Sequence, residues 1–114
     1  MDKLVDLDQL ENEFKKCRAT LAAIGDETRQ LIILCLMKST FPGMRVGEIT
    51  ENVKLSRPAV SHHLKVLKDA KIVSVVKQGT MNFYHINPTT SDLNLLKKLF
   101  SQIEASMFEC YESE

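Results

Sequence analysis

The sequence predicts an α+β fold that is mostly α-helical, with five helices and one β-hairpin in a single domain. Apolar residues recur at spacings of three and four through most of the chain, which is the pattern of helices buried on one side. Between residues 72 and 86 the pattern changes to runs rich in β-branched and aromatic residues around Gly79, which is typical of a hairpin. The 114 residues suffice for one domain, so we expect residues 1–114 to form one unit.

The helices predicted at the two ends, over residues 4–23 and 91–110, each carry an apolar seam with heptad spacing. The seams consist of Leu7, Leu10, Phe14, Cys17, Leu21 and Ile24, and of Leu93, Leu96, Phe100, Ile103, Met107 and Cys110. A domain this small offers neither seam an obvious partner, so we expect both to be buried in a symmetric homodimer. The expected interface residues are Leu7, Leu10, Phe14, Cys17, Leu93, Leu96, Phe100, Ile103 and Met107.

The second helix, predicted over residues 26–38, begins at Asp26, a residue type that caps helix N-termini. Its residues 31–37 are all apolar (LIILCLM), so we expect this helix to lie at the buried centre of the domain. A loop over residues 39–43 (STFPG) then leads toward the third helix, predicted over residues 47–53.

A fourth helix is predicted over residues 57–70, only three residues after the third. Ser56 is a good N-cap for it, and Pro58 is tolerated in a first helical turn. Two helices joined by so short a turn form a helix-turn-helix. The hairpin over residues 72–86 follows at once, so the whole is predicted to be a winged helix-turn-helix whose wing is the hairpin.

The charges of the chain are separated along its length although they sum to zero. Residues 1–13 and the segment from residue 104 onward are acidic, whereas residues 54–80 hold six basic side chains against Asp69 alone. A local basic surface attracts phosphates whatever the total charge is. The distribution therefore favours a nucleic-acid partner.

The start of the chain and its cysteines indicate a cytoplasmic protein with no membrane partner. The first residues are acidic and amphipathic, unlike a secretory signal, and no apolar run approaches the roughly 18 residues of a membrane span. The cysteines, Cys17, Cys35 and Cys110, are odd in number and widely spaced. Reduced thiols are therefore expected, not a disulfide framework.

The fourth helix has an apolar face, with Val60, Leu64 and Leu67, and a polar face opposite. Polar side chains near a helix N-terminus suit the major groove of double-stranded DNA, where they reach base edges and phosphates. The tip of the wing adds hydrogen-bond donors for the adjacent DNA backbone or minor groove. The expected DNA-binding residues are Ser56, Arg57, Pro58, Ser61, His62, His63, Lys65, Lys77, Gln78 and Thr80. For the helix alone, an ordinary solvated face explains the pattern equally well.

Three motifs follow one another along the chain: residues 21–29 (LAAIGDETR), residues 56–67 (SRPAVSHHLKVL), and Gly79 with residues 83–86 (FYHI). They resemble the opening signature, the recognition helix and the wing of the ArsR/SmtB family of arsenic- and metal-responsive repressors. The resemblance implies a bacterial homodimeric repressor that dimerises through its first and last helices and leaves its operator when an effector binds. We expect that operator to be an imperfect palindrome. The loop over residues 39–43 is longer than the resemblance implies.

The metal sites of that family do not fit this sequence. The arsenic-type site needs Cys-x-Cys near the third helix, where this chain has residues 45–49 (RVGEI), and the zinc-type site needs histidines on the last helix, which has none. His62 and His63 are about 100° apart on a helix, which is a poor arrangement for one metal. We therefore expect no metal and no cofactor, and the effector stays unknown.

Two alternatives concern the cysteines. Cys35 and Cys110 resemble the thiols of redox- and persulfide-sensing members of the family, which makes a redox-sensing repressor one alternative. Small core residues are nevertheless the favoured interpretation of all three cysteines, because free cysteine usually packs as a small apolar side chain. A thiol enzyme would need a nucleophile in a pocket beside a base, but Cys35 lies in the most apolar helix. We therefore expect no enzyme activity.

A protein-interaction module on the same fold is the other alternative. It would need a neutral or blocked outer face on the fourth helix. The presence of Arg57, Ser61 and Lys65 on that face argues against it.

Overall fold

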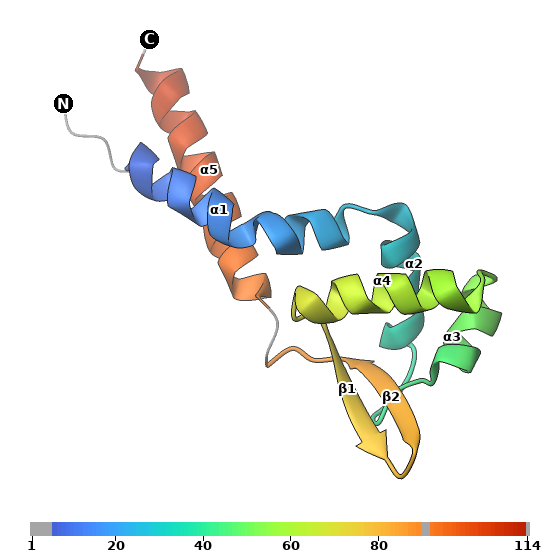
Figure 1. Ribbon diagram of the computed structural model, residues 1–114. Helices are drawn as coiled ribbons and strands as arrows, with labels where there is room; N and C mark the ends of the chain where they lie inside the picture. Colours follow the sequence, from blue (N-terminus) through green and yellow to red (C-terminus); the bar gives the residue numbers. More distant parts are fainter. Residues whose placement is uncertain (1–5, 90–91, 114) are drawn as a thin grey trace.

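The computed structural model describes residues 6–89 and 92–113, and its element order is that of a winged helix (Figure 1). The elements are α1 (Leu7–Ile24), α2 (Glu27–Met37), α3 (Val46–Val53), α4 (Arg57–Asp69), β1 (Val73–Gln78), β2 (Met81–Ile86) and α5 (Leu93–Glu112). The predicted fold class is thereby confirmed, and the element ends lie close to those predicted. Residues 4, 5 and 91, which the predictions placed in the terminal helices, lie outside the described residues.

Side-chain caps set where the central helices begin. Asp26 accepts a hydrogen bond from the backbone N–H of Arg29 at 2.9 Å, and Ser56 accepts one from that of Ala59 at 3.3 Å, as expected for N-cap residues. Between α3 and α4 the chain turns at Lys54, whose φ of 57° is left-handed. This short turn brings α3 and α4 into contact as a helix-turn-helix.

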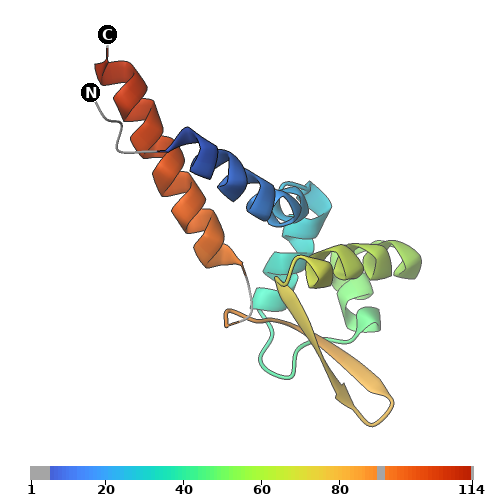
Figure 2. The ribbon, with the colours of Figure 1, turned by 60° about the vertical axis from the view of Figure 1, so that its left-hand side comes forward.

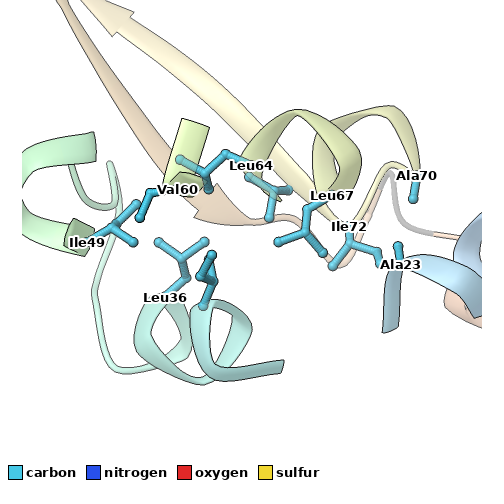
Figure 3. Packing of buried hydrophobic residues seen from close by; sticks show 10 residues of the cluster. Ala23, Leu36, Ile49, Val60, Leu64, Leu67, Ala70 and Ile72 are labelled. Carbon is cyan, nitrogen blue, oxygen red and sulfur yellow. The ribbon is translucent and has the colours of Figure 1, made fainter. Parts of the chain in front are cut away.

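The core of the winged helix lies where α2, α3 and α4 meet the base of the hairpin (Figure 3). Its largest fully buried side chains are Ile32, Leu36, Ile49, Val60, Leu64, Leu67 and Val73. The inward face of α4 is therefore the one expected from its periodicity. Packing on that face decides which α4 side chains point to solvent.

The expectation that α2 is buried on all sides is wrong. Leu31, Leu34 and Met37 are 50%, 55% and 62% exposed, whereas Ile32 and Leu36 are buried. α2 packs against α1, α3, α4 and β2, and no other described element covers its remaining face. An apolar helix is buried only where another element lies beside it, and the composition of the helix does not show where that is.

β1 and β2 pair antiparallel and project from the body as the wing (Figure 1). Val73 pairs with Ile86 at the base, and Gln78 pairs with Met81 next to the tip. Gly79 lies in the turn with a φ of 64°, the conformation that favours glycine there. The predicted hairpin and its turn are thereby confirmed.

The two terminal helices cross each other on one side of the winged body (Figures 1 and 2). Their contact buries Leu10 and Cys17 of α1 against Leu96 and Leu99 of α5. The expectation that the terminal seams have no partner within the chain is therefore wrong, because each helix buries part of the other's seam. The periodicity of each helix shows that it has an apolar side but does not show which element meets that side.

Much of both terminal helices nevertheless stays uncovered. The exposed apolar side chains there are Leu7, Phe14, Leu93, Phe100, Met107, Phe108 and Tyr111. The radius of gyration is 17.8 Å, against about 13 Å for a compact domain of this length, because α1 and α5 project from the body (Figure 2). Despite this apolar surface, none of the helices in the described ranges is long and apolar enough to cross a membrane.

Candidate nucleic-acid interface

The outward face of α4 is polar and open to solvent along the helix. Its exposed side chains are Ser56 at the N-cap and then Arg57, Pro58, Ser61, His62, Lys65, Lys68 and the acidic Asp69. Arg57 lies at the N-terminal end of α4, where the helix dipole adds partial positive charge. This face therefore offers donors for phosphate and short polar side chains for base edges.

The wing tip and the start of α4 each contribute to one cleft. Lys77, Gln78 and Thr80 are exposed at the tip. A cleft of about 540 Å³ is lined by Thr80 together with Arg57. The structure therefore brings one residue of each expected DNA-binding set, Arg57 of α4 and Thr80 of the wing, to the same cleft.

Arg45 and Asn82 line the same cleft, and the sequence did not single them out. Arg45 is the N-cap of α3, and the Arg57 guanidinium lies 3.8 Å from where a Cβ on Gly47 would be. Two guanidinium groups at a helix N-terminus suit a phosphate, although Glu48 also lines the cleft. The position of Arg45 two residues before the predicted third helix was the signal that could have found it.

Among the expected DNA-binding residues, His63 is the one that is half-buried. Its Nδ1 lies 3.3 Å from Nη1 of Arg29, whose side chain is 14% exposed. The same guanidinium donates to the carbonyl oxygens of Ala23 at 2.9 Å and Ala22 at 3.1 Å. Arg29 thus ties the end of α1 to α4. His63 is therefore half-buried against Arg29, while its neighbour His62 is exposed, and DNA contact by either histidine stays a prediction.

Lys65 pairs with Asp69 one turn along α4, with 3.9 Å between Nζ and Oδ2. Both side chains are largely exposed, and such a pair contributes little to stability because water and salt screen it. Lys65 can therefore exchange this carboxylate for a phosphate at little cost.

The three cysteines lie in different surroundings. Cys17 is buried between the terminal helices, where burial raises the pKa of its thiol and the Glu13 carboxylate adds to the effect. Cys35 is half-buried, and desolvation raises the pKa of its thiol as well. Its Sγ lies 3.6 Å from Sδ of Met44. Cys110 is exposed near the end of α5.

Cys35 and Cys110 are too far apart to join within one chain. In the part of the chain that is described, no Cα atom of α2 lies within 8 Å of α5, whereas a disulfide needs Cα atoms within about 7 Å. A switch using this pair would need α5 to move or a second chain to take part. Residues 6–89 and 92–113 hold no group of three or more His, Cys, Asp or Glu side chains placed for a metal ion.

Known proteins share both the sequence and the fold of this chain. Residues 26–75, which span α2 to the start of β1, match the family described as bacterial regulatory protein, arsR family. The HTH-type transcriptional regulator MJ1325 of Methanocaldococcus jannaschii is 39% identical over 74 residues, covering 65% of this chain and 81% of that protein. The transcriptional repressor SdpR of Bacillus subtilis is 40% identical over 67 residues, covering 59% and 71%.

A solved structure extends the likeness beyond the helix-turn-helix. The crystal structure of NolR from Sinorhizobium fredii matches with a TM-score of 0.61 and 29% identity, covering 91% of this chain and 95% of that one. MJ1325 and SdpR are both described as transcriptional regulators. The chain therefore belongs to the arsR family of bacterial regulatory proteins and is a DNA-binding transcriptional regulator.

Proposed function

We propose that this chain is a homodimeric repressor that reads an imperfect palindrome in double-stranded DNA and responds to an effector. The observation that carries the proposal is the separation of two surfaces. α4 and the wing present exposed polar and basic side chains, whereas α1 and α5 present exposed apolar ones. The proposed site of action is the cytoplasm, and the proposed function includes no enzyme activity.

DNA reading is assigned to α4, which enters the major groove with its N-terminal half. Ser61 and His62 are short or flat enough to meet base edges, and Arg57 can hold a guanine or a phosphate. Lys65 lies one turn further along and is suited to the backbone. The wing contacts the adjacent backbone or minor groove through Lys77, Gln78 and Thr80.

Dimerisation is assigned to the uncovered apolar side of α1 and α5. Phe100, Met107, Phe108 and Tyr111 line a shallow groove on α5, and an exposed apolar patch of this kind marks an interaction surface. A second copy is the occupant that fits best, because a two-fold axis through this region buries the same patch on both chains. The same two-fold axis sets the two α4 helices on one face of the dimer. They enter successive major grooves of DNA if they lie about 34 Å apart.

Fluorescence anisotropy with duplexes tiled upstream of the chain's own gene tests the DNA assignment. Arg57→Ala should weaken specific binding by about 1–3 kcal/mol. Lys38→Ala removes one positive charge from an exposed position after α2 and serves as the matched control. If both variants bind alike, the assigned face is wrong. If the protein binds no duplex better than a scrambled one, the result would favour the alternative that the chain is a protein-interaction module.

Light scattering after size-exclusion chromatography tests the dimer. The wild-type chain should elute at twice the mass of one chain. Phe100→Glu should shift the protein to monomer because it places a carboxylate in the apolar groove. Asn94→Glu adds the same charge at an exposed polar position of α5 and should stay dimeric. A dimeric Phe100→Glu would place the interface elsewhere.

A further inference from the structure

The cleft that Arg57 and Thr80 share lies where three parts of the winged helix meet. Arg45 and Gly47 line it from the start of α3, Arg57 from the start of α4, and Thr80 and Asn82 from the wing. α3 contacts both α4 and β2, which brings these residues together. The four polar ones among them are exposed, so a ligand that lies across the surface can reach them. The cleft therefore suits one part of a large ligand.

The two arginines of the cleft have no acidic partner. Within the described part of the chain, neither the Arg45 nor the Arg57 guanidinium group forms an ion pair. Glu48 and Glu51 also line the cleft, and the Glu48 carboxylate accepts a hydrogen bond from the backbone N–H of Arg45, at 3.2 Å. A guanidinium group can donate several hydrogen bonds to one phosphate. Two such groups without a paired carboxylate favour a ligand that carries phosphates.

The guanidinium group of Arg57 lies over the first turn of α3. Its Nη1 is 3.8 Å from the point that a Cβ on Gly47 would occupy. Ser61 and His62 lie further along the outward face of α4, one turn or more after Arg57. Arg57 therefore reaches into the cleft on the α3 side of its helix, whereas the short side chains of the reading face stay on the helix surface.

The place of this cleft on DNA follows from the proposed function, on which this step rests. There α4 lies in the major groove, and the wing contacts the adjacent backbone or minor groove. One sugar-phosphate strand separates a major groove from the adjacent minor groove. That strand then passes between α4 and the wing, and the cleft is lined by residues of both.

We propose that Arg45 and Arg57 bind phosphates of the strand that separates the two grooves. Arg57 then fixes the position of the protein on DNA and does not select the sequence, because phosphates are the same at every base pair. Selection is left to Ser61 and His62. The exposed carboxylates of Glu48 and Glu51 repel the same phosphates and so limit the affinity.

Anisotropy titrations of the full chain test the roles of the arginines, with the best-bound upstream duplex and a scrambled duplex. Arg57→Ala and Arg45→Ala should each weaken binding to both duplexes by the same factor, about fivefold or more, and lower the salt slope by about one per chain. Ser61→Ala should lower only the preference for the upstream duplex. If Arg57→Ala affects the upstream duplex alone, Arg57 reads a base and the proposal is wrong.

A variant that gains affinity separates the effect of charge from damage to the fold. Glu51→Gln removes a carboxylate from the cleft and should strengthen binding to both duplexes about two- to fivefold, the range for one exposed charge interaction. Glu27→Gln removes the same charge from an exposed position at the start of α2, outside the cleft, and should leave the affinity unchanged. Equal effects of the two variants would mean that DNA does not pass over the cleft.

Duplexes with one neutral methylphosphonate at a time identify the phosphates. At one or two neighbouring positions of the strand between the grooves, the wild type should lose affinity, and Arg57→Ala or Arg45→Ala should lose no more. If no position behaves in this way, the proposal is overturned. A wild type that prefers no duplex would count against the proposed function, whereas the affinities for any duplex and the salt slopes would still decide on the arginines.

Discussion

Replacing Arg29 by methionine tests the contact that joins α1 to the recognition helix. Methionine keeps most of the apolar stem of the side chain and removes the guanidinium. The change leaves the carbonyl oxygens of Ala22 and Ala23 and the Nδ1 of His63 without their partner. The ion pair with Asp26, at 4.0 Å and partly exposed, is lost as well.

The expected loss of stability follows from these contacts. A hydrogen bond from a charged donor contributes about 1.5–3 kcal/mol, but the carbonyls at the end of α1 regain some water when Arg29 is removed. The long ion pair between Arg29 and Asp26 contributes little to the free energy of unfolding. We therefore expect Arg29→Met to lower the free energy of unfolding by about 2–4 kcal/mol.

Urea unfolding at one fixed protein concentration measures this loss, since the stability of a dimer depends on concentration. Gln30→Ala is the matched control, because Gln30 also donates to a carbonyl at the end of α1, that of Ile24 at 2.8 Å, but is exposed and uncharged. Its loss should be about 1 kcal/mol or less. Equal losses in the two variants would refute the role assigned to Arg29.

Three further predictions concern the loop, the thiols and the wing. Gly43→Ala should lower stability to urea by about 1–3 kcal/mol, because alanine is strained at a φ of 109° and its Cβ meets Tyr84. Iodoacetamide should label exposed Cys110 faster than Cys35, because Cys35 is half-buried and desolvation raises the pKa of its thiol, which lowers the thiolate fraction; peptide mass spectrometry measures both rates. Lys77→Ala should lower the salt slope of DNA binding by about one per wing, as measured by anisotropy.

Each of these predictions has a contrary outcome. Gly25→Ala is the control for the loop, because Gly25 has an ordinary φ of −72°; an equal effect at both glycines would remove the special role of Gly43. Equal labelling of the two thiols would mean that Cys35 is more open in solution than the packing shows. An unchanged salt slope would mean that Lys77 does not reach a phosphate.

Features that depend on residues close together in the chain were predictable from the sequence. Asp26 and Ser56 cap their helices because a short side chain reaches the N–H groups of the next turn. The hairpin turn needs a residue with a positive φ, and Gly79 adopts it without steric cost because glycine has no Cβ. The inward and outward faces of α4 follow from the helical repeat, which is why nine of the ten residues expected to bind DNA are exposed.

Features that depend on which distant segments meet were decided by the tertiary structure. His63 is half-buried against Arg29, a residue 34 positions earlier in the chain. α2 keeps an exposed apolar face, and α1 covers part of α5, because packing leaves one side of α2 open and brings the two ends together. Arg45 and Asn82 line one cleft because α3 packs against β2. Hydrophobic periodicity shows that a face needs a partner but carries no information about which segment supplies it.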